Sequence, residues 1–129
     1  LDGQEVDIDM LVQNGKVKLG DLNAKRDWGY APDYVEAMWM ILQQDKADDF
    51  VIATGEVHTV EEFAKEAFEV AGLNWKDYVI TDSNFVPPVQ TGPLQGDSSK
   101  AKKILGWEAK TKFKDLVKKM VHSDLAKFS

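Results

Sequence analysis

The feature that most constrains the fold is a segment that is apolar on nearly every side. Residues 34–42 read YVEAMWMIL, and Pro32 suits the first turn of a helix because its missing N–H costs nothing there. A helix without a polar face has to be covered on more than one side. The sequence therefore predicts that another domain or a partner chain covers this helix.

A charged turn precedes this helix and holds the first candidate site. Lys25, Arg26, Asp27 and Trp28 follow one another directly. The guanidinium of an arginine is a rigid fork suited to phosphates and carboxylates, and helix N-termini favour anions. The residues alone leave two interpretations open: an anion-binding turn, or a surface pair between Arg26 and Asp27 or Asp33.

The rest of the chain predicts a single α/β domain with a small mixed sheet, three main helices and one short helix. Weak alternation up to Val12 and the turn Asn14-Gly15 predict a hairpin over residues 5–19. The capping-box pattern TVEE at 59–62 opens a helix that Gly72 ends. Further strands are expected at 49–53 and 77–81, and further helices at 99–105 and from Thr111 onward.

Composition excludes several classes of protein. The net charge is −6, with +6 from residue 98 onward and −12 before it, and this acidic surface argues against nucleic acid. There is no cysteine and no apolar run long enough to span a membrane. The start, LDGQEVDID, does not resemble a signal peptide, which predicts a cytoplasmic protein. The two histidines, His58 and His122, do not form a metal-binding pattern, so no metal site is expected.

Two stretches resemble a known family. LGDLNAKRDWGYAPDYVEAMWMILQQ, followed by DDFVIATGEVHTVEEFAKEAF, is similar to the C-terminal part of GDP-mannose 4,6-dehydratases, within the extended short-chain dehydrogenase/reductase superfamily. LQGDSSKAKKILGW resembles the closing segment found across that superfamily. The resemblance predicts a nucleotide-sugar-binding lobe over 17–129, preceded by an unmatched arm or hairpin strand over 1–16.

The resemblance also implies a function and its residues. The parent reaction converts GDP-mannose to GDP-4-dehydro-6-deoxy-mannose and water, with NADP as cofactor and an N-terminal Rossmann domain as partner. Arg26 is expected to contact the diphosphate, with Gly20, Asn23 and Lys25 beside the nucleotide. Where the family has an arginine for a second diphosphate contact, in F-R-P-x-E-V, this chain has Val86.

The cofactor site and the catalytic pair of the superfamily are missing from this sequence. No G-x-G-x-x-G or G-x-x-G-x-x-G turn exists, and no tyrosine is followed four residues later by a lysine. We therefore expect no catalytic residue and no bound NADP in this chain, which would not be catalytic alone.

Two alternatives to this function stay open. The chain could be a structural or self-associating domain that kept the fold and lost the ligand, forming a homo-oligomer through residues 34–42 or 6–12. It could also be the lobe of a related reductase or epimerase. The tryptophans are interpreted mainly as packing residues, with Trp107 anchoring the last helices to the sheet.

Overall fold

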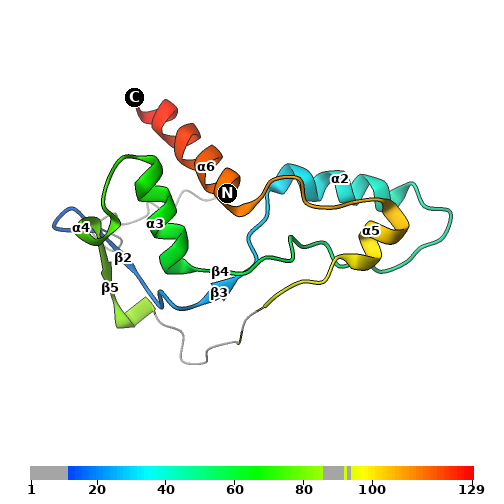
Figure 1. Cartoon of the computed structure of the whole chain (residues 1–129), viewed down its shortest axis with the longest axis horizontal. Helices are drawn as coiled ribbons and strands as arrows, with labels where there is room; N and C mark the ends of the chain where they lie inside the picture. Colours follow the sequence, from blue (N-terminus) through cyan, green and yellow to red (C-terminus); the bar gives the residue numbers. More distant parts are fainter. Residues whose placement is uncertain (1–11, 86–91, 93) are drawn as a thin grey trace, which may run out of the picture.

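The computed structural model describes residues 12–85, 92 and 94–129. The elements run in the order shown in Figure 1, with two helical parts joined by extended segments. Helices α3 (Val60–Val70), α4 (Trp75–Tyr78) and α6 (Phe113–Phe128) lie towards one end, and helices α2 (Ala31–Leu42) and α5 (Ser99–Leu105) lie towards the other. The predicted α/β class, with three main helices and a short one, is confirmed, and α4 is an additional single turn.

The main sheet is mixed, as predicted, and has three strands. Strand β1 (Val12–Gln13) pairs antiparallel with β2 (Lys16–Leu19), which pairs in parallel with β5 (Val79–Thr81). Asn14 and Gly15 connect β1 to β2 with φ values of 52° and 72°, the left-handed conformation that a two-residue hairpin turn requires. The predicted hairpin is confirmed over 12–19, and its earlier part lies outside the described residues.

A second sheet of two strands lies between the two helical parts. Strand β3 (Lys25–Arg26) pairs antiparallel with β4 (His58–Thr59), and Leu94 makes a parallel bridge to Arg26. The helix boundaries follow local chemistry. The capping box of Thr59 and Glu62 is formed as predicted, and the backbone after α3 turns at Gly72 with a φ of 75°.

Three predictions about elements are corrected. Residues 49–53 are not a strand in the structure, and they join no ladder among the described residues. Tyr78 and Asp77 belong to the one-turn helix α4, so β5 begins at Val79. Helix α6 begins at Phe113 instead of Thr111, and the backbone N–H of Thr111 donates to the Asp33 carboxylate of α2.

Two groups of apolar residues form the interior. One lies between α2 and α5 and centres on Trp107, which is 2% exposed and packs with Ala37, Ala101 and Ala109. The other lies between α3, α6 and the main sheet, and includes Val79, Phe113, Leu116 and Val117. Trp107 thus anchors the chain to α2, which corrects the prediction that it anchors helices to the sheet.

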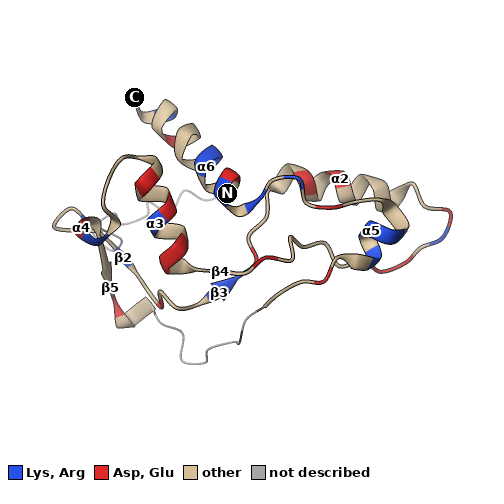
Figure 2. Cartoon of the chain, viewed as in Figure 1, with Lys and Arg blue, Asp and Glu red and all other residues tan. Residues whose placement is uncertain are grey.

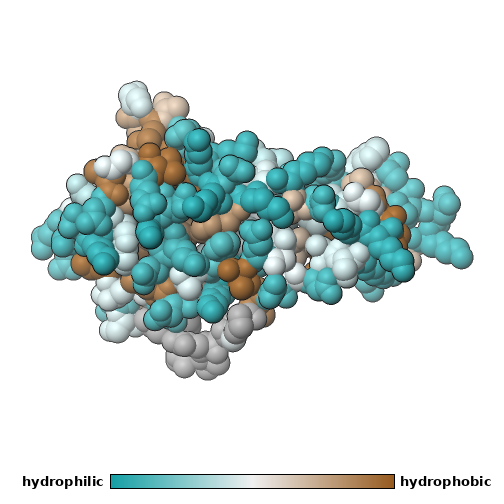
Figure 3. Space-filling view, in the orientation of Figure 1, coloured by the Kyte–Doolittle hydropathy of each residue, from teal (hydrophilic) through white to brown (hydrophobic). Residues whose placement is uncertain are grey.

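Several apolar side chains stay exposed in the described structure. On α2, only Asp33 and Ala37 are buried. The apolar stripe of α6 is buried at its start, but Met120, Leu125 and Phe128 near its end are exposed, and Figure 3 shows apolar surface along this part of the helix. None of the described helices is both long and apolar enough to cross a membrane.

Candidate functional site

The candidate site begins where the two parallel strands end. Leu19 closes β2 and Thr81 closes β5, and the two residues are direct partners in the ladder. The backbone N–H of Asp82 donates to the carbonyl of Leu19 over 2.8 Å, which holds the chain together just after the strands. Open α/β sheets bind ligands outside the carboxyl ends of their strands, so this edge is the position that the fold favours for a ligand.

Gly20 lies at this edge and is packed against the backbone of another segment. A Cβ added to Gly20 would lie 2.5 Å from the carbonyl oxygen of Phe85, closer than side chains come to backbone atoms. Only glycine allows this approach, because every other residue carries a Cβ. Gly20 therefore brings the turn after β5 against the end of β2.

Two aspartates make this edge acidic. The carboxylate of Asp21 accepts a hydrogen bond from the backbone N–H of Asn23 over 2.9 Å, and that of Asp82 accepts one from the backbone N–H of Asn84 over 2.9 Å. Carboxylates accept hydrogen bonds from hydroxyl groups and repel phosphates. The edge around Gly20 thus suits the hydroxyls of a sugar better than a diphosphate.

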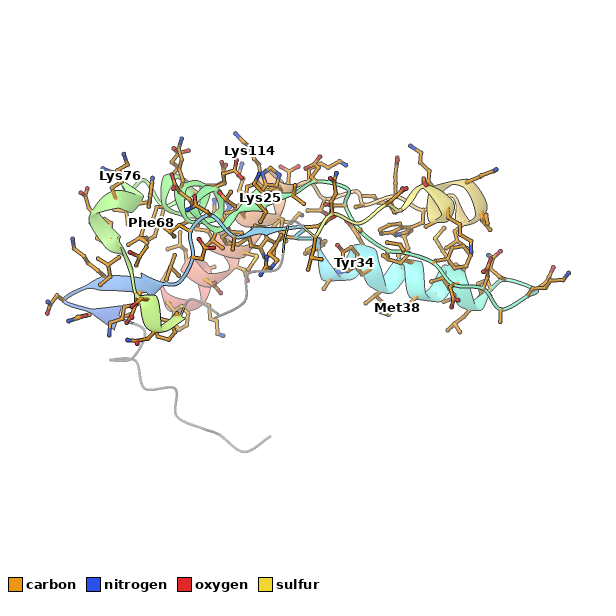
Figure 4. All side chains as sticks on the ribbon, turned by 90° about the horizontal axis from the view of Figure 1, so that it is seen from below. Lys25, Tyr34, Met38, Phe68, Lys76 and Lys114 are labelled. Carbon is orange, nitrogen blue, oxygen red and sulfur yellow. The ribbon has the colours of Figure 1, made fainter. Side chains whose placement is uncertain are left out.

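The cations that the sequence singled out lie further along, on β3. Lys25 is exposed, whereas Arg26 is half-buried and its Nη1 donates to the carbonyl of Lys25 over 2.7 Å. Successive side chains of a strand point to opposite faces, so the side chains of Lys25 and Arg26 lie on opposite faces of the β3–β4 ribbon. Figure 2 marks β3 as a basic segment, and Figure 4 places Lys25 near the middle of the molecule.

Arg26 forms no ion pair with any carboxylate of the described chain. Asp27 and Asp33, the two partners that the alternative interpretation named, are both engaged with other groups. The surface-pair interpretation of Arg26 is therefore wrong for this part of the chain. Among the described residues, the carbonyl of Lys25 is the acceptor of the one hydrogen bond that the guanidinium donates.

Asp27 fixes the loop that leads into β4. Its carboxylate accepts hydrogen bonds from the backbone N–H of Thr54 over 3.1 Å, from the Thr54 hydroxyl, and from the backbone N–H of Gly55 over 2.9 Å. On the other side of this loop, the Gln95 side chain donates to the carbonyl of Gly55 over 2.7 Å. Sequence reasoning missed this role, because nothing in the local pattern links residues 27 and 54.

Trp28 has a structural role. Its ring lies 5.2 Å from that of Phe63 in α3 and 6.1 Å from that of Phe113 in α6. It therefore packs the charged turn onto the second apolar group, as the packing interpretation predicted.

Asp33 and Tyr34 connect the start of α2 to the distant C-terminal part. The Asp33 carboxylate accepts hydrogen bonds from the backbone N–H groups of Lys110 and Thr111 over 3.1 and 2.8 Å. Burial and the nearby charges of Asp27 and Asp33 raise the pKa of the Tyr34 hydroxyl. Asp27, Trp28 and Asp33 thus hold distant segments of the chain together, whereas Arg26 forms no ion pair within the described residues.

His58 forms a separate cluster beside α3. Its ring stacks on Phe113 with 3.8 Å between the ring centres, and its two nitrogens lie 3.5 and 3.7 Å from carboxylate oxygens of Glu62 and Glu56. His122 lies elsewhere, on α6. Within the described ranges, no set of three His, Asp or Glu side chains is arranged to hold a metal ion.

Comparison with solved structures defines the class of protein. A UDP-glucose 4-epimerase of Thermotoga maritima with UDP-glucose superimposes with a TM-score of 0.77 at 25% identity, over 88% of this chain and 36% of that one. A dTDP-glucose 4,6-dehydratase of Bacillus anthracis in complex with NAD gives a TM-score of 0.75 at 19% identity, over 92% of this chain and 37% of that one. The fold is that of one part of such nucleotide-sugar enzymes.

Sequence comparison gives the family. The model of the GDP-mannose 4,6 dehydratase family matches residues 8–120. GDP-mannose 4,6 dehydratase 2 of Arabidopsis thaliana is 57% identical over 110 residues, 85% of this chain, and the human GDP-mannose 4,6 dehydratase is 45% identical over 124 residues, 83% of this chain. The chain belongs to the GDP-mannose 4,6-dehydratase family, and it spans 30% and 33% of the length of these two relatives.

The residues of this chain do not fit a dinucleotide. The nine glycines are scattered and form no pyrophosphate-binding turn, and no tyrosine and lysine are spaced by one helical turn. That this chain itself holds no NADP stays a prediction.

Proposed function

We propose that this chain is the nucleotide-sugar-binding lobe of a GDP-mannose 4,6-dehydratase and is not catalytic alone. Within the complete enzyme, it would contribute substrate contacts to the conversion of GDP-mannose to GDP-4-dehydro-6-deoxy-mannose and water. A separate NADP-binding domain of the Rossmann type would supply the cofactor. Membership of the family and the similarity to a solved UDP-glucose complex support this proposal.

One observation carries the assignment of the ligand residues. Arg26 is held in a strand by pairing with β4 on one side and Leu94 on the other, yet its guanidinium faces no carboxylate of the described chain. A fixed and unneutralised guanidinium is suited to a diphosphate. We assign the diphosphate to Arg26, with Asn23 nearby and the sugar hydroxyls towards Gly20 and its flanking aspartates. Lys25, on the opposite face of the β3–β4 ribbon, does not share this ligand in our assignment.

Calorimetric titration of the chain with GDP-mannose tests the proposal. We expect saturable binding that Arg26→Ala weakens by about ten- to hundredfold, because one charge-assisted contact contributes about 1.5–3 kcal/mol. Lys76→Ala is the matched control, because Lys76 is an exposed cation on α4, away from β3. NADP should give no heat.

Two results would contradict the proposal. Equal affinities for the unchanged chain and Arg26→Ala would remove Arg26 from the site. Turnover of GDP-mannose with NADP by the chain alone would show that it does not need a second polypeptide.

A structural, self-associating domain is the second candidate function. The observation in its favour is the uncovered face of α2, where Trp39 is 62% and Leu42 is 80% exposed. This candidate expects no binding of GDP-mannose at millimolar concentration and a concentration-dependent homo-oligomer in size-exclusion chromatography. A monomer that binds GDP-mannose would rule it out.

A further inference from the structure

Arg26 and His58 are direct partners in the ladder of β3 and β4. Residues directly opposite each other in an antiparallel pair lie on the same face of the sheet, with their Cβ atoms about 4.5–5.5 Å apart. Both residues are half-buried, and the guanidinium of Arg26 stays close to its own strand because it donates to the carbonyl of Lys25. The register therefore places a titratable imidazole beside the candidate anion-binding group.

Packing against α6 fixes the orientation of the His58 ring. The ring lies nearly parallel to that of Phe113, with 3.8 Å between the ring centres and 12° between the planes. Phe113 is 6% exposed and contacts the rings of Trp28 and Phe63 as well, so it cannot easily move aside. Rotation of the imidazole would break the stacking, and its two nitrogens therefore point in fixed directions.

Each nitrogen of this ring faces a carboxylate. Nδ1 lies 3.5 Å from Oε2 of Glu62, and Nε2 lies 3.7 Å from Oε2 of Glu56. Nε2 is buried and forms no hydrogen bond with any described residue. A neutral imidazole carries one N–H, whereas a protonated imidazole carries an N–H on both nitrogens. Protonation of His58 would thus supply a donor to both glutamates and give the buried Nε2 a partner, as buried polar groups usually have.

The charges around the neutral ring are balanced. Glu56 and Glu62 are negative, Arg26 is positive, and Nζ of Lys112 lies 3.7 Å from Oε1 of Glu56. A proton on His58 would therefore give this group of side chains one surplus positive charge. The other charged residues that line the same hollow between α3 and α6 form two pairs, Lys114 with Glu66 over 3.8 Å and Lys65 with Glu69 over 4.0 Å.

We propose that His58 is a positioning residue whose protonation strengthens the binding of a phosphate-bearing anion at Arg26. This inference rests on the proposed function, which assigns the diphosphate to Arg26. The imidazole does not touch the ligand, because both of its nitrogens face carboxylates of this chain. It acts through its charge, which lies on the same face of the β3–β4 ribbon as the guanidinium and attracts the anion when the ring is protonated.

Proton NMR of the ligand-free chain tests the coupling between His58 and Arg26. The chain has two histidines, so His122→Gln identifies which ring signals belong to His58. At about pH 6.5, where histidine side chains titrate, Arg26→Gln should move these signals towards those of a protonated ring, because a neighbouring cation disfavours the charged form. Glu56→Gln should move them in the opposite direction. The signals of His122, an exposed residue of α6, are the internal reference in both variants.

Calorimetric titration tests the effect on the ligand. The chain should bind GDP-mannose about three- to tenfold more tightly at about pH 5.5 than at about pH 7.5, the effect of one added charge near a partly exposed site. His58→Gln should still bind but lose this pH dependence, and His122→Gln should keep it. Inorganic pyrophosphate is the second probe, and comparing each variant with the unchanged chain at the same pH cancels the protonation of the probe itself. Circular dichroism checks that each variant is folded.

Several results would overturn the inference. His58 signals that move in neither Arg26→Gln nor Glu56→Gln would show that the ring does not sense these charges. Binding of neither probe would remove the anion site on which the inference rests. GDP-mannose binding with equal pH dependence in the unchanged chain and His58→Gln would refute this inference alone. Binding of pyrophosphate that depends on His58, without any binding of GDP-mannose, would refute the proposed function alone.

Discussion

The indole Nε1 of Trp107 donates a hydrogen bond to the backbone carbonyl of Asp33 over 2.8 Å, across 74 residues of sequence. The carboxylate of the same aspartate binds the backbone N–H groups of Lys110 and Thr111. Both residues are almost completely buried, with 2% and 7% exposure. This cluster joins the start of α2 to the segment before α6, and it sets the position of the charged turn that precedes α2.

Asp33→Asn should lower the free energy of unfolding by about 1.5–3 kcal/mol, because hydrogen bonds to an ionised acceptor are stronger than those to an amide. Urea denaturation followed by tryptophan fluorescence measures the change. Asp124→Asn, at an exposed position of α6, should change it by less than about 0.5 kcal/mol. Equal effects of the two substitutions would contradict the anchoring role of Asp33.

Gly29→Ala should be destabilising by about 1–3 kcal/mol, the usual range for forcing extra atoms into a packed site. A Cβ at Gly29 would overlap the hydroxyl end of the Tyr34 ring. Gly92→Ala is the matched control, since a Cβ there meets no atom of the described residues within 4 Å. Thermal denaturation of the two variants should give a clearly lower midpoint for Gly29→Ala, and matching midpoints would refute the steric argument.

The capping box of α3 should make stability depend on acid pH. The hydrogen bond from the Thr59 backbone holds the pKa of Glu62 below its ordinary value, with a smaller contribution from His58. The ionised form is therefore favoured in the folded state, so its stabilisation is present above the unfolded pKa and is lost as the pH falls through the folded pKa.

In Glu62→Gln, the decrease of unfolding free energy between about pH 6 and pH 3 should be smaller than in the unchanged chain. Glu61→Gln, an exposed neighbour outside the box, is the control. Thr59→Ala should lower stability by about 0.5–2 kcal/mol at neutral pH. If Glu62→Gln and Glu61→Gln had the same pH dependence as the unchanged chain, the capping box would not contribute.

Gly20→Ala should reduce both stability and affinity for GDP-mannose. The added methyl would lie 2.5 Å from the backbone oxygen of Phe85. The end of a side chain could change its rotamer to avoid this contact, but a backbone atom can move only if the whole segment shifts. Arg26→Ala, in contrast, should reduce affinity with little change in the unfolding midpoint. Denaturation and titration of both variants, done in parallel, check this. An unchanged unfolding midpoint for Gly20→Ala would show that the turn after β5 can move away from residue 20 at no cost in stability.

Val86→Arg should raise the affinity for GDP-mannose by about ten- to hundredfold, the gain expected from one charge-assisted phosphate contact. The reason lies in the sequence, since the family resemblance predicts an arginine where this chain has Val86, a residue outside the described ones. The same substitution in an Arg26→Ala background shows whether the two guanidinium groups share one ligand. A gain with inorganic phosphate alone as large as that with GDP-mannose would indicate unspecific attraction.

Local chemistry in the sequence determined the ends of most elements. Asn14-Gly15, the Thr59–Glu62 box and Gly72 each specify a turn or a cap through their own backbone and side chains, and the structure confirms all three. The dense match of the charged turn to one family also depended on sequence alone, and the comparisons confirm that family. These features can be predicted from the sequence because residues only a few positions apart produce them.

Only the tertiary structure decided what the residues of the charged turn do. Asp27 and Asp33 bind groups 27 to 78 residues away, Trp28 packs onto α3 and α6, and Arg26 remains without a carboxylate partner in the described chain. It also showed that residues 49–53, predicted as a strand, join no ladder among the described residues. The physical reason is that a strand and a buried carboxylate depend on partners far away in sequence, which local pattern does not specify.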